Sequence, residues 1–190
     1  MSRETTKRVF DVVMGAVAVV ITMPLMVMTA VTVLVTSGRP VFLVQERVGG
    51  NERPIRVVKF RTMHRGAPVV AKSELRVTAG LYTPLGPFLR KTSLDELPQL
   101  WNVLRGEMSL VGPRPALPSQ EDLLALRRAT GVTALKPGLT GLAQVLGRES
   151  LTLSTKVRAE ALYARRVSLR LDVGILLWTI RAVLFGRGAY

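Results

Sequence analysis

A stretch of 25 residues without a charged side chain, at positions 12–36, constrains this chain more than any other feature. It is too long for the apolar part of a secretory signal, and no evident cleavage site of small residues follows it. As a straight helix it would rise about 38 Å, which exceeds the ~30 Å hydrocarbon core of a bilayer. The sequence therefore predicts a membrane-associated helix over residues 9–36.

Pro24 lies in the middle of this stretch, where a proline removes a backbone hydrogen bond and bends a helix. A single transmembrane helix is the simpler topology. It would carry Arg3, Lys7 and Arg8 across the membrane, against the tendency of basic residues to stay in the cytoplasm. A re-entrant helix that bends at Pro24 and returns to the same face keeps these residues and Arg39 on one side. Both topologies stay open from the pattern alone.

The rest of the chain is strongly basic. Residues 37–190 contain 24 Lys and Arg against 11 Asp and Glu, a net charge of +13. Such a field attracts nucleic acids, phosphorylated small molecules or an anionic membrane surface. Aromatic residues make up only 5% of the chain and no known nucleic-acid-binding motif is present, so nucleic acid is not predicted as a partner.

The chain contains no cysteine and a single histidine, His64. This composition excludes a disulfide framework, a thiolate metal site and a site of several histidines. Any metal must therefore be held by oxygen ligands, which favours Mg²⁺ or a similar hard cation.

One domain that mixes helices with a small sheet is expected after the apolar stretch. Two runs rich in β-branched residues, 41–48 and 55–60, flank a turn-forming loop and predict a β-hairpin. Helices are predicted near 97–104, over 119–129 with Ser119 as N-cap and Gly131 beyond its end, over 151–167 and over 172–185. The last helix belongs either to the core or to the headgroup boundary of a membrane. The predicted fold class is α+β, mainly helical, with a small hairpin and an N-terminal Pro-bent membrane helix.

The segment at 90–100, RKTSLDELPQL, places two adjacent carboxylates at the expected start of a helix. Pro98 is best tolerated in a first helical turn, so the helix should begin near Asp95. The positive end of the helix, with Arg90 and Lys91 upstream, favours an ionised Asp95 that can act as a nucleophile beside a phosphate. An ordinary acidic helix start with neighbouring salt bridges is the simpler interpretation of the Asp95–Glu96 pair alone.

Other segments are compatible with phosphate binding. Lys59 and Arg61 flank a phenylalanine in KFRTM, Arg114 lies in the rigid turn GPRP at 112–115, and residues 136–144 form a Gly-rich loop with a basic start. Taken singly, each resembles a solvated basic loop. None is a Walker A or dinucleotide-binding loop, so ATP hydrolysis and nicotinamide chemistry lack support.

In order along the chain, these segments resemble those of the bacterial sugar transferases. These are the small monotopic phosphoglycosyl transferases, or polyprenyl-phosphate hexose-1-phosphate transferases. The similarity extends from residue 7 to about residue 184, and its matching blocks are KRVFD (7–11), GRPVF (38–42), QERVG (45–49), KFRTM (59–63), TSLDELPQL (92–100), MSLVGPRP (108–115) and KPGLTG (136–141). The resemblance implies that residues 1–37 form a re-entrant membrane helix bent at Pro24. Residues 38–190 would then form a catalytic domain on the cytoplasmic face of the bacterial inner membrane.

The resemblance also implies a ping-pong reaction that initiates polysaccharide or glycoprotein assembly. Asp95 attacks the β-phosphate of a UDP-sugar, UMP leaves, and polyprenyl phosphate (undecaprenyl phosphate) takes the sugar-phosphate from the aspartyl intermediate. Glu96 is similar to the magnesium ligand of the family, and Arg90 to its phosphate-binding arginine. The predicted site therefore has Asp95 and Glu96 as catalytic residues and Mg²⁺ on Glu96, with substrate bound by Lys59, Arg61, Arg90, Arg114 and Pro115.

A non-enzymatic alternative also follows from the basic charge and the apolar segment. The chain would then be a membrane-anchored module that binds lipid or nucleotide-sugar without catalysis. Two departures from the family pattern are Met23, where many members have Ser, and Glu160, where Asp is expected. The identity of the sugar and the oligomeric state are not encoded in these motifs, and a homo-oligomer remains open.

Overall fold

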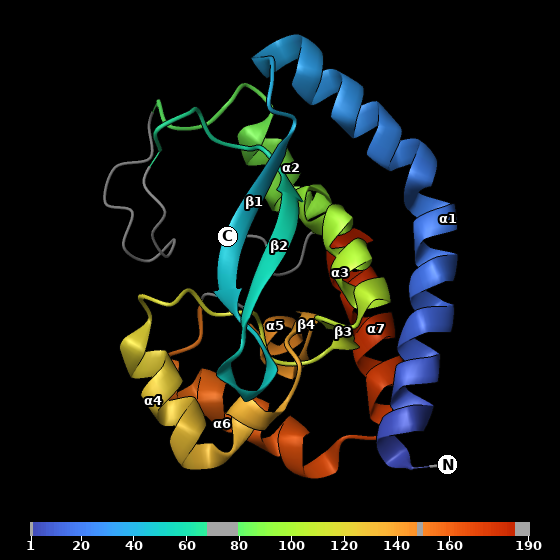
Figure 1. Cartoon of the computed structure of the whole chain (residues 1–190), viewed down its shortest axis with the longest axis vertical. Helices are drawn as coiled ribbons and strands as arrows, with labels where there is room; N and C mark the ends of the chain where they lie inside the picture. The colour runs from blue at the N-terminus through green and yellow to red at the C-terminus, as the bar shows by residue number, and fades with distance from the viewer. Residues whose placement is uncertain (1, 68–79, 148–149, 185–190) are drawn as a thin grey trace.

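The computed structural model describes residues 2–67, 80–147 and 150–184 of the chain (Figure 1). Helix α1 (Arg3–Ser37) runs along one side of the molecule and changes direction partway along its length. Ser2 caps its start by accepting a hydrogen bond from the Thr5 amide at 3.2 Å. Pro24 lies inside the helix and has no N–H to donate to the preceding turn, which provides the physical cause of a bend.

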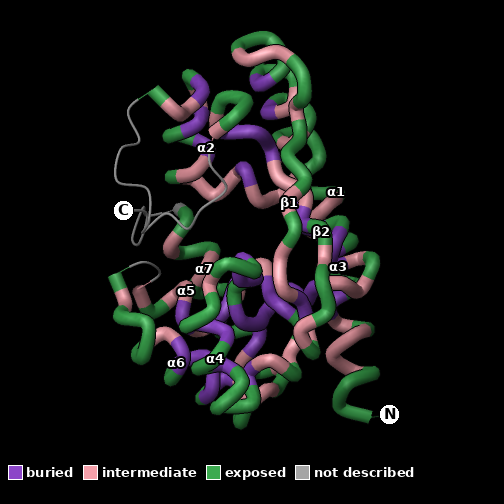
Figure 2. The backbone as a smooth tube through the Cα atoms, turned by 60° about the vertical axis from the view of Figure 1, so that its left-hand side comes forward, coloured by how far each residue is buried: buried purple, intermediate pink, exposed green. Residues whose placement is uncertain are grey.

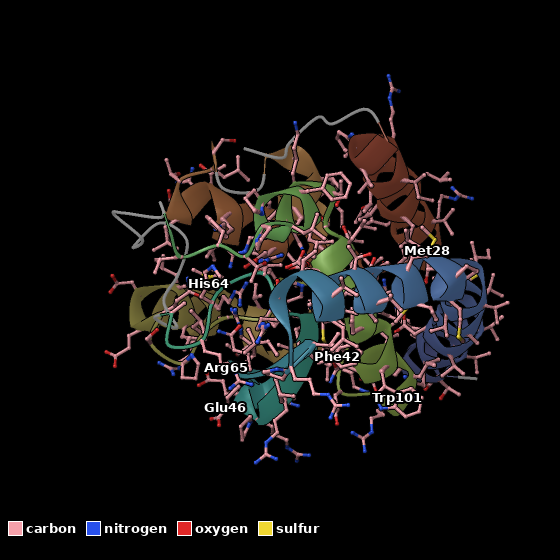
Figure 3. The ribbon with its side chains drawn as sticks, turned by 90° about the horizontal axis from the view of Figure 1, so that it is seen from above. Met28, Phe42, Glu46, His64, Arg65 and Trp101 are labelled. Carbon is pink, nitrogen blue, oxygen red and sulfur yellow. The ribbon has the colours of Figure 1, made fainter. Side chains whose placement is uncertain are left out.

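Helix α1 is long and apolar enough to cross a membrane, and little of its surface is covered by protein. Val20, Ile21 and Val35 are 71%, 72% and 77% exposed, whereas a core helix of a soluble protein would bury such side chains. Figure 3 views the molecule from above. Helix α1, on which Met28 is labelled, crosses this view, and the labelled Phe42 and Trp101 appear on one side of the helix. The predicted apolar helix is present, with the exposed surface expected of membrane association.

The first half of α1 is fixed to the rest of the protein by polar contacts. Lys7 Nζ lies 2.8 Å from Asp172 of helix α7 (Leu169–Leu184). Arg8 donates to the carbonyl oxygens of Val103 and Leu104, at the end of helix α3 (Leu100–Arg105), at 2.7 Å each. These bonds supply donors to the last turn of α3, where a helix leaves carbonyl groups without partners in the helix itself.

The predicted hairpin is confirmed. Strands β1 (Phe42–Val48) and β2 (Pro54–Phe60) are antiparallel, with Phe42 opposite Phe60 and Val48 opposite Pro54. A 3₁₀ turn, η1 (Gly50–Glu52), connects them. The rings of Phe42 and Phe60 stack with centroids 5.2 Å apart, which aligns the two strands at their open end.

A second, unpredicted pair of strands holds the GPRP turn. β3 (Ser109–Val111) and β4 (Gly138–Thr140) pair in parallel. The Gly112 amide donates to Thr140 O at 2.9 Å, and the Gly138 amide to Pro113 O at 2.8 Å. A side chain at Gly138 would place its Cβ 2.1 Å from the Gly112 nitrogen, so glycine is required where the two backbones meet. Strands of three residues carry no periodic signal that sequence analysis could detect.

The helices after the hairpin lie near their predicted positions, but one helix was not predicted, and the type of one helix and the N-cap of another differ from the prediction. Helix α2 (Gly86–Thr92) was not predicted, and the helix expected to begin near Asp95 begins as a 3₁₀ helix, η3 (Leu94–Gln99), that continues into α3. The predicted N-cap Ser119 is wrong. Gln120 occupies that position of helix α4 (Glu121–Thr130), and its Oε1 accepts from the Leu117 amide, whereas Gly131 ends the helix as expected.

The remaining helices are η4 (Val132–Ala134), α5 (Leu142–Leu146), α6 (Leu153–Arg166) and α7. They pack around a larger hydrophobic cluster and a smaller one between α4 and α6. The larger cluster joins β2, α3, α6 and α7 through Val57, Leu100, Tyr163 and Ile175. Figure 2 shows the buried backbone concentrated between the hairpin and the helices, while α1 is mostly exposed or intermediate. Helix α7 buries Ile175 in the core and leaves Leu177 63% exposed. Contact of its exposed face with the headgroup boundary of a membrane stays a prediction.

Candidate active site

The two adjacent carboxylates lie on η3, directly beside strand β2. Ser93 adopts a left-handed conformation (φ 59°) that ends α2 and turns the chain into η3. Pro98 and Gln99 are buried and fix the other end of this short helix. Asp95 is 6% exposed and the Glu96 side chain 14%, so both acids lie in a poorly hydrated environment. Sequence analysis placed them at a helix start, and the structure confirms that position.

Glu96 is held by cations from two other segments of the chain. Lys59 Nζ, on β2, lies 2.9 Å from Glu96 Oε1. Arg114, in the turn after β3, donates to Oε1 at 2.7 Å and to Oε2 at 3.3 Å. Burial alone would raise the pKa of Glu96, but Arg114 and Lys59 outweigh it and hold the pKa well below its usual range. The structure thus brings together Glu96, predicted as a catalytic residue and metal ligand, with Lys59 and Arg114, both predicted to bind substrate.

Asp95 has the opposite electrostatic balance. Burial and the neighbouring Glu96 carboxylate raise the pKa of Asp95 to about 6, against the opposing effect of Lys59, Arg114 and Arg90. Asp95 is thus mainly ionised at neutral pH, in agreement with the predicted ionised carboxylate, even though its pKa is raised. A carboxylate of raised pKa is the better nucleophile of the pair.

Arg90 is positioned on α2 by two side chains. Its Nε donates to Thr62 Oγ1 at 3.2 Å and its Nη1 to the Tyr82 hydroxyl at 3.0 Å. The guanidinium carbon also lies 5.2 Å from the centre of the Tyr82 ring. Because Arg90 favours the ionised form of Asp95, it belongs to the same cationic site as Lys59 and Arg114.

The two other residues predicted to bind substrate, Arg61 and Pro115, make contacts outside the cluster around Glu96. The buried Arg61 guanidinium donates to the carbonyl oxygens of Ser37, Gly38 (2.9 Å) and Arg39 (3.0 Å), so it fastens the segment that follows α1. Pro115 is buried, and its carbonyl accepts from Arg47 Nη1 at 3.1 Å. A role in binding substrate stays a prediction for both residues.

Sequence analysis assigned no role to Arg47, which lies on β1. Its Nε donates to Gln45 Oε1 at 3.0 Å. Burial and the nearby Arg114 lower the pKa of Arg47 to about 10, so it remains a cation at neutral pH. Glu96 and Arg90 also affect its titration, which places Arg47 within electrostatic range of the site. The sequence signal that could have indicated the contact between Arg47 and Gln45 was their spacing of two residues, since alternate residues of a strand share one face.

A buried ion pair behind the GPRP turn was also missed. Arg127 of α4 donates to both carboxylate oxygens of Glu160 of α6, at 2.8 and 2.6 Å. Its Nη2 also donates to the backbone carbonyl of Arg114 at 2.9 Å. The pair therefore braces the turn that carries Arg114. No local sequence pattern signals it, because the partners are distant in sequence and only the fold brings them together.

The two carboxylates suit a metal ion that takes only one or two ligands from the protein, such as Mg²⁺, better than one held entirely by protein side chains. Within residues 2–67, 80–147 and 150–184, no three Asp, Glu, His or Cys side chains gather closely enough to hold a metal ion. Mg²⁺ is commonly held by one or two carboxylates, with water and substrate phosphates as its other ligands. Glu96 and the adjacent Asp95 supply carboxylate oxygens of this kind, while Lys59 and Arg114 contact the Glu96 carboxylate in this structure. A Mg²⁺ ion at this position stays a prediction.

The chain belongs to the bacterial sugar transferase family, whose family description matches residues 2–186. The chain is 38% identical to the exopolysaccharide production protein ExoY of Rhizobium meliloti (strain 1021), over 97% of this chain and 88% of the relative. It is 38% identical to the UDP-galactose-lipid carrier transferase of Erwinia amylovora, over 97% of this chain and 41% of that protein. The chain is 36% identical to a UDP-glucose:undecaprenyl-phosphate glucose-1-phosphate transferase of Klebsiella pneumoniae, over 97% of this chain and 41% of that protein.

The predicted family and the predicted enzyme class, a phosphoglycosyl transferase, are thereby confirmed. This chain spans most of the ExoY protein and less than half of the two larger transferases.

Proposed function

We propose that the protein transfers a sugar-1-phosphate from a UDP-sugar to a membrane polyprenyl phosphate, releasing UMP. One observation carries this proposal above the others. A buried, mainly ionised Asp95 lies beside Glu96 within a cluster that includes Lys59, Arg90 and Arg114. The names of the relatives, which include undecaprenyl-phosphate sugar phosphotransferases, support the two substrates. The exposed apolar surface of α1 supports an acceptor that resides in the bilayer.

In the first step, an Asp95 carboxylate oxygen attacks the β-phosphorus of the UDP-sugar. The bond from that phosphorus to the oxygen that bridges the two phosphates breaks, and UMP leaves with that oxygen and the bonding electron pair. Attack by an anion on an anionic phosphate is opposed by repulsion, which is strong where water is scarce. Lys59, Arg90 and Arg114 offset this repulsion by stabilising the charge that develops on the phosphoryl oxygens.

In the second step, a phosphate oxygen of the polyprenyl acceptor attacks the phosphorus of the sugar-phosphoryl aspartate. The bond between phosphorus and Asp95 breaks, which restores the carboxylate and yields a polyprenyl-diphosphate-sugar. Each step exchanges one phosphorus–oxygen bond for another, so the reaction needs no oxidant or reductant. Glu96 is proposed as the protein ligand of a Mg²⁺ ion, which when bound would supply positive charge to the phosphate oxygens.

The function test is a panel of UDP-sugars mixed with polyprenyl phosphate and the membrane-bound protein. We expect UMP formation with at least one sugar, together with a product in which the lipid carries that sugar through a diphosphate. UMP is measured by coupled assay and the lipid product by mass spectrometry. Binding of a UDP-sugar without any UMP across the panel would instead favour a non-catalytic binding module.

We also propose that α1 is re-entrant, with both ends on the cytoplasmic face of the bacterial inner membrane. Lys7 and Arg8 make their contacts with α7 and α3, while Arg61 binds the carbonyl groups that follow α1, so each end of α1 is tied to the same domain. A helix that spanned the bilayer would place these two ends on opposite faces.

Because the chain has no cysteine, single cysteines report this topology cleanly. In sealed inverted vesicles, Ser2→Cys and Ser37→Cys are expected to react with an impermeant maleimide from the same side. Labelling of one position only after the vesicles are opened would restore a transmembrane helix.

A further inference from the structure

Arg47 is a partly buried guanidinium that is held in place from two directions. Its Nε and Nη2 donate to Gln45 Oε1, two residues earlier on β1. Its Nη1 donates to the Pro115 carbonyl, one peptide beyond Arg114. A guanidinium has five N–H donors, so these bonds leave two without an acceptor among the residues that the structure describes.

The charges around Arg47 make its position costly without a further anion. Burial is the main effect that disfavours its protonated form; Arg114 and Arg90 add to it, and Glu96 opposes it. Counting Lys59, the site gathers four cations around the two carboxylates Asp95 and Glu96. Buried charges are normally balanced by partners of opposite sign. Without a ligand, the protein groups of this site carry an excess of positive charge, which favours a phosphate-bearing ligand.

We propose that Arg47 is a substrate-binding residue whose guanidinium contacts the diphosphate of the nucleotide-sugar. This inference rests on the proposed function, because it assigns a ligand to the same site. Gln45 and the Pro115 carbonyl orient the guanidinium, so that its remaining donors serve phosphoryl oxygens. A planar guanidinium suits this task, since it forms two parallel hydrogen bonds with phosphate.

The test measures UDP affinity by calorimetry with the full chain in nanodiscs. Arg47→Met is expected to weaken UDP binding by about tenfold to hundredfold, the range for lost hydrogen bonds to charged groups. Binding of UMP, which lacks the β-phosphate, should weaken less. The matched control is Arg105→Met, an arginine that is 61% exposed, at the end of α3, which should leave UDP affinity unchanged.

A second experiment distinguishes direct contact between Arg47 and UDP from an indirect role of Arg47 in supporting the turn that carries Arg114. If Arg47 acts only by holding the carbonyl next to Arg114, then Arg47→Met should have no further effect once Arg114 is replaced by Met. Direct contact predicts that the double variant binds UDP more weakly than Arg114→Met alone. Arg47→Lys keeps the charge but cannot form the same fork of bonds, so we expect an intermediate loss. That variant also keeps the test valid if Arg47→Met lowers the melting temperature.

The two substrates are distinguished by steady-state kinetics. The proposal expects kcat/KM for the UDP-sugar to fall in Arg47→Lys, with a much smaller change for polyprenyl phosphate. A loss confined to polyprenyl phosphate would mean that Arg47 binds the acceptor, and the proposal would be wrong. UDP affinity of Arg47→Met within twofold of the unmodified protein would also overturn it. If the unmodified protein neither binds UDP nor forms UMP, the proposed function itself fails.

Discussion

Replacing Asp95 with Asn is expected to lower UMP release by about 10⁴-fold or more, the scale seen when an enzyme loses its nucleophile. The amide keeps the size of the side chain but cannot form the phosphoryl intermediate. Burial and Glu96 disfavour the Asp95 anion in the folded protein, as its raised pKa indicates. Removing that charge therefore should not lower the melting temperature, and membrane binding should persist. The measurement is UMP release by the purified protein in nanodiscs, with vesicle flotation for membrane binding.

Asp122→Asn is the matched control, because Asp122 is an exposed acid in the first turn of α4. Its UMP release should equal that of the unmodified protein. Unchanged release in Asp95→Asn would remove Asp95 from the proposed role. Loss of membrane binding together with activity would show instead that the substitution disturbs the fold.

Replacing Glu160 with Gln is expected to destabilise the protein by about 3–5 kcal/mol, because it leaves the Arg127 guanidinium buried without its anion. Arg127 and Glu160 side chains are only 6% and 3% exposed, so water cannot take over the lost contact. Thermal unfolding in detergent measures this loss. The double variant Arg127→Met with Glu160→Leu should recover most of the stability, since it removes both charges from the interior.

Activity should not recover in that double variant. The Arg114 carbonyl loses the hydrogen bond that Arg127 provides at 2.9 Å, so the turn that carries Arg114 is less firmly placed. Glu52→Gln serves as the control, because its pairing with Arg128 is exposed and should contribute little. An unchanged melting temperature in Glu160→Gln, or full turnover in the double variant, would contradict the bracing role of this ion pair.

The features that could be predicted from the sequence are those with a local physical signal. The apolar run and Pro24 predicted a bent helix, and the β-branched runs around a Gly-rich loop predicted the hairpin. Asp95 and Glu96 stood out because adjacent acids beside Pro98 mark a helix start. Gly131 was correctly placed after α4 for a similar reason, because glycine tolerates the left-handed conformation there.

The features that were missed depend on contacts between distant segments. The β3–β4 pair joins three-residue strands, and its backbones pass so closely at Gly112 and Gly138 that no side chain fits, a requirement that no periodicity reveals. Arg127 and Glu160 are ordinary charged residues on two amphipathic helices until the fold buries them together. The contacts of the Arg61 guanidinium with the backbone that follows α1 likewise join segments distant in sequence, and its role in binding substrate stays a prediction.

The central claim is that Asp95 becomes covalently loaded with sugar-phosphate before the lipid acceptor reacts. The direct measurement is mass spectrometry of the protein incubated with its UDP-sugar in the absence of polyprenyl phosphate. We predict a mass increase of one sugar-phosphate on the peptide that contains Asp95, with an equal amount of UMP released. An unmodified peptide, with UMP appearing only when both substrates are present, would contradict it.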